Sequence, residues 1–173
     1  KIRNTLKFIS WNLVDYDPNT KVDEFAKPDQ YILESLNLLV KNVTEAFDKY
    51  NFGEATSDIM TFMSTDLSSF YLDINKDVLY CEGKDSLRRR QVQTALYVVG
   101  ETLLRLLNPI LPFTMDEFNR NMPGEIKSNP QYYDYPKYHE VNAELLKEYD
   151  NFKLLRDDVL KALEEARNNK VIG

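Results

Sequence analysis

The chain has 173 residues, of which 43% are hydrophobic and 29% are charged, with a formal net charge of −6. This length suits one domain with a real core, no run approaches the roughly 18 apolar residues of a membrane span, and the start lacks a signal-peptide pattern. The single cysteine, Cys81, excludes an internal disulfide and favours a reducing compartment, while the acidic balance argues against diffuse attraction to nucleic acid and leaves room for a local basic patch.

Both ends of the sequence resemble the interior of a longer chain. Lys1 starts inside an amphipathic helical pattern with no capping residue before it, and its charge sits at the helix end where acids are favoured. The apolar positions of this first helix are Ile2, Leu6, Ile9 and Leu13. Residues 171–173 look like the start of a strand or linker. We therefore expect a fragment of a longer protein.

The region from Pro28 to Tyr50 predicts a long helix. Its apolar residues recur at alternating spacings of four and three, which places them on one stripe of a helix. They are Leu36, Val40, Val43, Phe47 and Tyr50. Pro28 suits the first helical position, where its missing N–H is not needed. After a turn at 51–53, a second apolar stripe with the same spacing predicts a further helix. Its members are Met60, Met63, Leu67, Phe70, Ile74 and Cys81.

A break at 82–85 separates this stripe from another long helix, which Asp85 or Ser86 is expected to cap. The core positions of that helix are Val92, Leu96, Val99, Leu103, Leu106 and Ile110. Pro109 and Pro112 should end it, because proline cannot donate to the helical hydrogen-bond ladder. Thr114 with Glu117 has the spacing of a capping box, and predicts a short fifth helix.

The remaining third of the chain predicts a loop and one more helix. Residues 123–141 are rich in tyrosine and proline and have no apolar period, so we interpret them as a linker whose tyrosines pack on the bundle or stack on RNA bases. Residues 142–168 have a helical stripe and a mixed-charge outer face. The sequence thus predicts an all-α fold, an antiparallel bundle of about five helices over 1–122, with a C-terminal extension helix over 142–173.

Motifs for catalysis and metal binding are missing from the sequence. His139 is the only histidine and Cys81 the only cysteine, so neither a His/Cys metal site nor a His-activated nucleophile can be assembled. The five glycines are scattered singly, without a phosphate-binding loop. We expect no catalytic residue, no metal site and no cofactor in this chain.

Three motifs in the segment from Ser69 to Thr114 carry a family resemblance. They are Phe-Tyr-Leu-Asp-x-x-Lys-Asp-x-Leu-Tyr from Phe70, an arginine triplet followed by Gln-Thr-x-Leu-Tyr, and Asn-Pro-Ile-Leu-Pro-Phe-Thr from Asn108. In this order and spacing the chain resembles the anticodon-binding helical domain of bacterial isoleucyl-tRNA synthetases. Valyl enzymes share the bundle but usually have a different first motif. Asn108 and Phe118 depart from the family, which usually has a small residue and a nearby tryptophan there.

The resemblance implies that the fragment binds the anticodon stem-loop of isoleucine tRNA and positions it for a ligase that uses ATP. The ATP-site signatures of such enzymes are absent, so ATP and zinc are expected only in other parts of the parent protein. The implied partners are tRNA and the catalytic and C-terminal domains of the parent, in a cytoplasmic monomer without membrane contact. The alternatives are the equivalent domain of a valyl enzyme, or a helical protein-interaction module with no RNA role, which the acidic charge would suit.

The arginine triplet admits two interpretations. On a helix, Arg88 and Arg89 extend the core-facing stripe, and an antiparallel neighbour would bring Asp77 near Arg89 or Arg90 and Asp73 nearer Val92. We therefore take Asp73, Asp77 and Arg89 as candidates for a structural ion-pair cluster. Arginines that face outward can bind phosphate bidentately, which makes Arg88 and Arg90 candidates for tRNA binding.

A second basic patch lies on the first helix, where Asn4 shares a face with Lys7, and Arg3 lies one turn before Lys7. With Lys84 in the predicted turn, these residues complete the candidate tRNA contacts. The same residues could instead form an ordinary solvated face or a domain junction. Trp11, the only tryptophan, is either a packing residue or a platform for base stacking.

Overall fold

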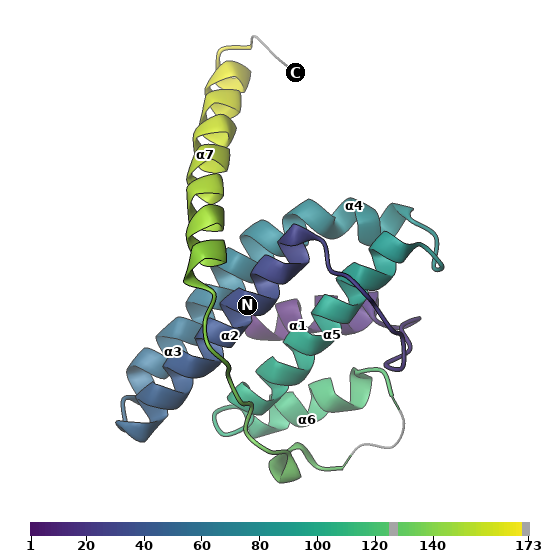
Figure 1. Cartoon of the computed structure of the whole chain (residues 1–173), viewed down its shortest axis with the longest axis vertical. Helices are drawn as coiled ribbons and strands as arrows, with labels where there is room; N and C mark the ends of the chain where they lie inside the picture. Colours follow the sequence, from purple (N-terminus) through teal and green to yellow (C-terminus); the bar gives the residue numbers. More distant parts are fainter. Residues whose placement is uncertain (125–127, 171–173) are drawn as a thin grey trace. The chain divides into compact units, whose positions relative to one another are not determined.

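The computed structural model describes residues 1–124 and 128–170, and all its regular elements are helical (Figure 1). The all-α prediction is confirmed. The chain divides into two compact units, Lys1–Glu140 and a second that begins at Val141. The finer division into bundle, linker and extension stays a prediction, and the expectation for residues 171–173 lies outside the described residues.

The first unit is built around α5, which packs against α1, α2, α4 and α6. The elements of this unit are α1 (Ile2–Asn12), α2 (Lys27–Asp48), α3 (Phe52–Thr61), η1 (Phe62–Leu72), α4 (Asp73–Cys81), α5 (Leu87–Leu107), α6 (Pro112–Asn121) and η2 (Pro130–Tyr132). The predicted core stripe of α5 is fully buried at Val92, Leu96, Val99, Leu103 and Leu106. Burial of such aliphatic side chains contributes about 1.5–3 kcal/mol each, which makes α5 the centre of the unit.

Helix starts follow local capping at α5 but not at α6. Ser86 caps α5, its hydroxyl accepting from the amide of Arg89 at 3.4 Å. The prediction of a capping box at Thr114 and Glu117 is wrong, since α6 begins at Pro112. Proline has the backbone φ of a helix already in place and needs no N–H in the first turn, so the helix starts one turn earlier.

The helical stretch from Phe52 to Cys81 is continuous but not uniform. Its middle part, η1, has the wider turns of a π-helix, in which the hydroxyls of Ser68 and Ser69 donate to carbonyls five residues earlier. A wider turn rotates the following residues relative to an α-helical register. The predicted stripe is accordingly wrong at its ends: Met60, Ile74 and Cys81 are exposed, whereas Met63, Leu67 and Phe70 are buried.

The long helix α2 ends earlier than its sequence pattern indicates. Leu36, Val40 and Val43 are buried as predicted. Tyr50 is 82% exposed, because the chain leaves α2 at Asp48 and Tyr50 adopts a left-handed backbone conformation with φ 57°. The predicted stripe is therefore confirmed in its middle and wrong at Tyr50.

The described part of the tyrosine- and proline-rich segment is fastened to helices of the first unit. The Tyr133 hydroxyl donates to the amide oxygen of Asn119 at 3.2 Å, and its ring lies 5.8 Å from the guanidinium of Arg105. Further along, the amide of His139 donates to the Asn37 side chain at 3.0 Å. These contacts make residues 128–140 a strap along the bundle.

The second unit contains α7 (Ala143–Asn168), which Asn142 caps by accepting from the amide of Leu145 at 3.1 Å. Several large apolar side chains of α7 are exposed, namely Phe152, Leu154, Leu155, Val159, Leu160 and Leu163.

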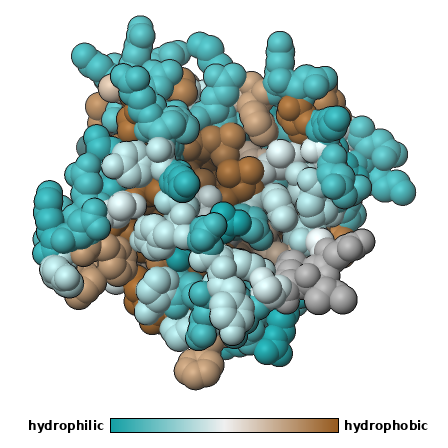
Figure 2. Space-filling view, turned by 60° about the horizontal axis from the view of Figure 1, so that its bottom comes forward, coloured by the Kyte–Doolittle hydropathy of each residue, from teal (hydrophilic) through white to brown (hydrophobic). Residues whose placement is uncertain are grey.

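The face of the molecule in Figure 2 is mostly hydrophilic, with hydrophobic residues visible between polar ones. Within residues 1–124 and 128–170, none of the helices combines the length and apolar character needed to cross a bilayer.

A buried carboxylate connects four of these helical segments. Asp29, in the first turn of α2, is 0% exposed. Both of its oxygens accept from the Arg88 guanidinium of α5, one of them at 3.0 Å, and Tyr71 of η1 donates to it at 2.6 Å. Arg88 also donates to the side chain of Asn75 in α4 at 2.8 Å, and the backbone amide of Ala26 donates to Asp29 at 3.2 Å.

We expect Arg88→Met to lower the free energy of unfolding by about 3–5 kcal/mol, because it leaves the Asp29 carboxylate buried without its counter-charge. The matched control is Lys76→Met, which removes an exposed cation paired with Asp73 on the same helix and should change stability by less than about 1 kcal/mol. Urea unfolding followed by circular dichroism measures both. Equal losses in the two variants would contradict the role of the network.

Burial and the neighbouring Asp29 raise the pKa of the Tyr71 hydroxyl well above its ordinary value of 10.0. The unfolded chain therefore releases this proton at a lower pH than the folded protein does, and stability should fall as the pH rises above 10. We expect Tyr71→Phe to be less stable than wild type at pH 7, with a difference that narrows at pH 11. Urea titrations at the two pH values test this, and a difference that widens in alkali would refute it.

Candidate nucleic-acid interface

The arginine triplet at the start of α5 faces the protein and not the solvent. Both terminal nitrogens of Arg88 donate hydrogen bonds to Asp29, and one of them also donates to Asn75. The Arg88 side chain is 26% exposed. Arg88 therefore has a structural partner inside the first unit. The tRNA-binding role expected for it from the sequence stays a prediction.

Arg89 and Arg90 converge on Asp15, in the segment that follows α1. Arg89 donates to both carboxylate oxygens, at 2.6 and 3.1 Å, and its Nε donates to the carbonyl of Leu79 at 3.3 Å. Arg90 donates to the Asp15 carbonyl at 2.9 Å and to the side chain of Gln93 at 2.7 Å. The arginines thus tie the end of α1 to α5, and their side chains are 16% and 19% exposed.

The partner expected for Arg89 needs correction. Arg89 pairs with Asp15, whereas the sequence suggested Asp73 and Asp77 as its partners. Asp73 instead pairs with Lys76 of its own helix at 3.1 Å. The antiparallel register alone suggested the acids of α4. Arg89 does contact α4, through the Leu79 carbonyl, but its terminal nitrogens bind Asp15 in the segment that follows α1.

The other candidate cations lie elsewhere, on α1 and in the turn before α5, and they are exposed. Arg3, Asn4, Lys7 and Trp11 are all exposed, and Trp11 is 71% exposed. Lys84 is also exposed, in the turn between α4 and α5. The inner face of α1 is buried through Leu6, Ile9 and Leu13, with Thr5 and Ser10 beside them. This amphipathic pattern presents one polar, cationic ridge to solvent.

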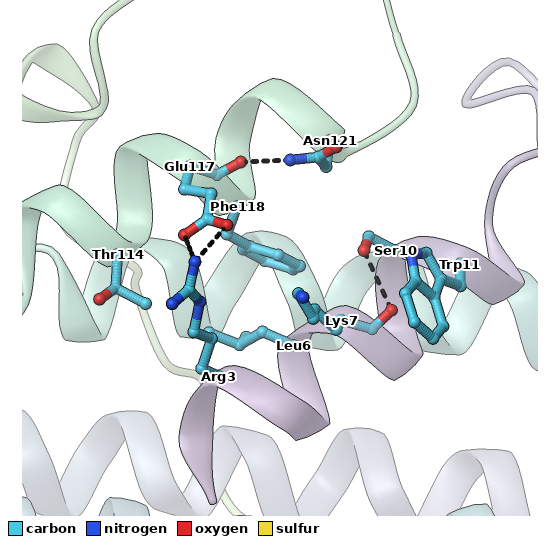
Figure 3. A pocket seen from close by; sticks show the side chains of 9 residues that line it. All are labelled: Arg3, Leu6, Lys7, Ser10, Trp11, Thr114, Glu117, Phe118 and Asn121. Carbon is cyan, nitrogen blue, oxygen red and sulfur yellow. Dashed lines mark hydrogen bonds and ion pairs between the residues drawn. The ribbon is translucent and has the colours of Figure 1, made fainter.

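A pocket of about 160 Å³ lies between α1 and α6 (Figure 3). Its apolar floor is formed by Leu6 and Phe118, which are 2% and 5% exposed. Arg3 and Glu117 lie at one end of the pocket and Trp11 at the other, with Lys7 between them. The remaining lining residues are Ser10, Thr114 and Asn121.

The charges at this pocket are exposed and paired. Arg3 donates through Nη2 to both carboxylate oxygens of Glu117, at 2.7 and 2.8 Å. This hydrogen bond lowers the pKa of Glu117 and raises that of Arg3. With side chains 64% and 45% exposed, such a pair adds little to stability. The Lys7 ammonium lies 5.9 Å from the centre of the Trp11 ring, near the outer limit of a cation–π contact.

A second groove, of about 350 Å³, borders the other side of α1. It is lined by Asn4, Thr5, Phe8, Ser68, Leu72, Asp73, Lys76 and Tyr80. The rings of Phe8 and Tyr80 meet there edge to face at 6.3 Å. Asn4 and Lys7, which the sequence placed on one face, therefore line different hollows, while Arg3 and Lys7 share the pocket.

Sequence reasoning found the α1 side of the pocket and missed the α6 side. Thr114, Glu117, Phe118 and Asn121 have the spacing of one helical face, which was a usable signal. What the sequence lacked was the contact between α1 and α6, two elements about a hundred residues apart. In the described residues no group of three or more His, Cys, Asp or Glu side chains could bind a metal ion.

Comparison with known proteins gives one family. The family model "Anticodon-binding domain of tRNA ligase" matches residues 29–173. The whole chain also aligns, over 178 positions, with the isoleucine–tRNA ligases of Bacillus mycoides strain KBAB4, at 46% identity, and of Bacillus cereus strain B4264 and Bacillus anthracis strain CDC 684, at 47%. The chain covers 19% of each of these relatives, about a fifth of their length.

We expect Arg89→Ala to lower the free energy of unfolding by about 1–3 kcal/mol at pH 7, since it removes both hydrogen bonds that Arg89 donates to the Asp15 carboxylate. Although burial works to raise it, the pKa of Asp15 lies below its usual value because hydrogen bonds from Arg89 and Gln93 outweigh that burial. The stabilisation is therefore present above the ordinary aspartate pKa and lost as the pH falls through the folded-state value. Denaturant titrations should show the wild-type advantage shrinking between pH 7 and pH 3, and an advantage that grows in acid would contradict the pairing.

Proposed function

This chain belongs to the anticodon-binding domains of tRNA ligases, and from that membership we propose that it binds the anticodon stem-loop of a tRNA. The observation that carries the proposal is the family match over residues 29–173, joined to identity of 46–47% over the whole chain with isoleucine–tRNA ligases. The longer protein would then be an isoleucine–tRNA ligase of the cytoplasm, a monomer that joins isoleucine to its tRNA with ATP.

In this proposal the fragment positions the tRNA, and the chemistry belongs to other parts of the protein. The catalytic and C-terminal domains of the parent would be its covalent neighbours, and ATP and zinc would bind to those parts. Within the described residues, exposed cationic side chains on α1 and at Lys84, in the turn before α5, can donate hydrogen bonds to an RNA. Contacts of this kind fix the position of an RNA backbone, and unpaired bases are then read by stacking and by hydrogen bonds to their edges.

The acidic net charge is compatible with RNA binding because the acidic side chains are not spread evenly among the basic ones. The carboxylates of Asp29, which is buried, and of Asp15 pair with the three arginines of α5. Arg3 and Lys7 remain on the exposed ridge, opposed there by the carboxylate of Glu117. We propose α1 as the principal backbone-contacting element, with Lys84 as a separate contact.

A labelled anticodon stem-loop RNA, followed by fluorescence anisotropy, should bind the chain with a dissociation constant on the order of 10⁻⁴–10⁻⁶ M. Neutralising two or three phosphates gives a slope of log K against log salt of about −1.4 to −2.7. The double variant Arg3→Gln, Lys7→Gln removes two such contacts and should reduce the magnitude of the slope by about 1.4 to 1.8. Lys49→Gln is the control, because Lys49 is exposed at the end of α2 and lines neither hollow beside α1. If the chain binds the RNA at low salt no more tightly than it binds a neutral polymer, the proposed function is refuted.

Glu117→Gln should strengthen RNA binding, whereas the loss of Arg3 and Lys7 should weaken it. The Glu117 substitution removes a negative charge from the rim and releases Arg3, so RNA affinity should rise about two- to fivefold, because the carboxylate no longer repels the phosphates. Asp116→Asn is the matched control, since Asp116 lies on the same helix, pairs with Arg120 and does not line the pocket. Equal gains in the two variants would mean that net charge, and not the α1 ridge, governs binding.

A further inference from the structure

We propose that the pocket between α1 and α6 receives one unpaired nucleobase, which stacks on the indole of Trp11 while Lys7 and Arg3 bind the attached phosphate. This inference rests on the proposed function, that the chain binds RNA. Three of the residues that it uses, Arg3, Lys7 and Trp11, precede residue 29, where the family match begins, and the α6 side of the pocket lies within the match.

The shape of the pocket limits what it can hold. Sites for drug-sized ligands have volumes of roughly 300–1,000 Å³, whereas this pocket has about 160 Å³. It therefore suits a single flat ring system. Its floor, Leu6 and Phe118, is apolar and buried, and its rim carries an indole, an ammonium and a guanidinium group. An apolar slot with cations at its mouth matches the two parts of a nucleotide, the base and its phosphate.

The exposure of Trp11 is the strongest sign that the pocket has an occupant. At 71% exposure, most of its surface faces solvent, although tryptophan is usually well buried on average. The fold does not need this side chain for its core, since α1 is anchored through Leu6, Ile9 and Leu13. Aromatic side chains in such positions are the usual stacking platforms for unpaired bases.

Two existing contacts compete with the base, and their magnitudes favour exchange. Lys7 lies over the Trp11 ring, but a cation–π contact at an exposed site contributes only about 2- to 5-fold in an equilibrium constant, against about 5- to 150-fold for a stacked base. The phosphate that enters with the base also attracts the Lys7 ammonium. Arg3 can keep its bond from Nη2 to Glu117 and present Nη1 and Nε to the same phosphate.

The pocket also offers polar groups for the edge of the base. Asn121 donates through Nδ2 to the carbonyl of Glu117 at 2.7 Å, which fixes its amide and leaves Oδ1 as an acceptor. The hydroxyl of Thr114 lines the same hollow. With few such groups, discrimination between bases should be modest and the contribution of stacking dominant.

Trp11 is the only tryptophan in the chain, so its intrinsic fluorescence reports on this pocket alone. We expect an anticodon stem-loop RNA with an unpaired loop to quench the emission in a saturable way. A blunt RNA duplex with a similar number of phosphates should bind by anisotropy with little quenching. Adenosine 5′-monophosphate should quench saturably as well, more weakly than the RNA, and Lys7→Gln should weaken its binding.

Substitution of Trp11 separates stacking from backbone contacts. Trp11→Ala should weaken binding of the loop RNA by about 5- to 150-fold, the factor that corresponds to 1–3 kcal/mol of stacking, and leave duplex affinity unchanged. Val14→Ala is the control, because Val14 is 81% exposed beside α1 and does not line the pocket. Circular dichroism confirms that each variant keeps its helices.

The outcomes distinguish this inference from the proposed function. If loop RNA binds by anisotropy without quenching Trp11, and Trp11→Ala binds as wild type does, the nucleobase pocket is wrong and RNA binding stands. Such a result would assign the exposed indole to contact with another protein domain. If the RNA fails to bind while adenosine 5′-monophosphate quenches saturably, the pocket stands and the proposed function falls. If neither ligand binds, both are refuted.

Discussion

The Asp29 carboxylate is the interaction on which the arrangement of the first unit depends. Hydrophobic burial is non-directional, so the apolar stripes of α2, η1, α4 and α5 could pack in more than one register. Asp29 accepts from Arg88 and Tyr71, and Arg88 reaches on to Asn75, so all four segments must arrive at one point together. The network is also the reason why an arginine is tolerated in the first turn of α5. A cation there is opposed by the helix dipole, and a buried carboxylate offsets that cost.

The sequence predicts what depends on local periodicity and misses what depends on distant contacts. The buried stripe of α5 and the cap at Ser86 follow from spacing and residue type. The widening of the helix in η1 departs from that period, and there the hydroxyls of Ser68 and Ser69 donate to carbonyls five residues earlier. The partners of the arginines could not be found from local spacing because they are distant in the sequence. Asp29 is 59 residues from Arg88, and Asp15 is 74 residues from Arg89, in a segment without a regular pattern.

These pairings also explain how an acidic chain can keep a cationic surface. Charge counting treats all arginines alike, but guanidinium groups bound to buried or half-buried carboxylates contribute little field outside the protein. With Arg88, Arg89 and Arg90 engaged in this way, the sign of the surface near α1 is set by Arg3, Lys7 and Glu117. Net charge was therefore a poor guide to partners, and the local balance on one helix is the relevant quantity.

The same contacts make α1 a rigid element, and rigidity matters for a weak binding site. Association costs free energy for every side chain or segment that it immobilises, so a preorganised surface keeps more of its contact energy. The buried face of α1 is fixed by Leu6, Ile9 and Leu13, and the segment after it is tied to α5 through Asp15. A hollow lies on each side of this helix, one lined by Trp11 and the other by Tyr80. An RNA strand that follows the ridge would thus meet cations along the backbone path and an aromatic ring beside it, without the helix having to move.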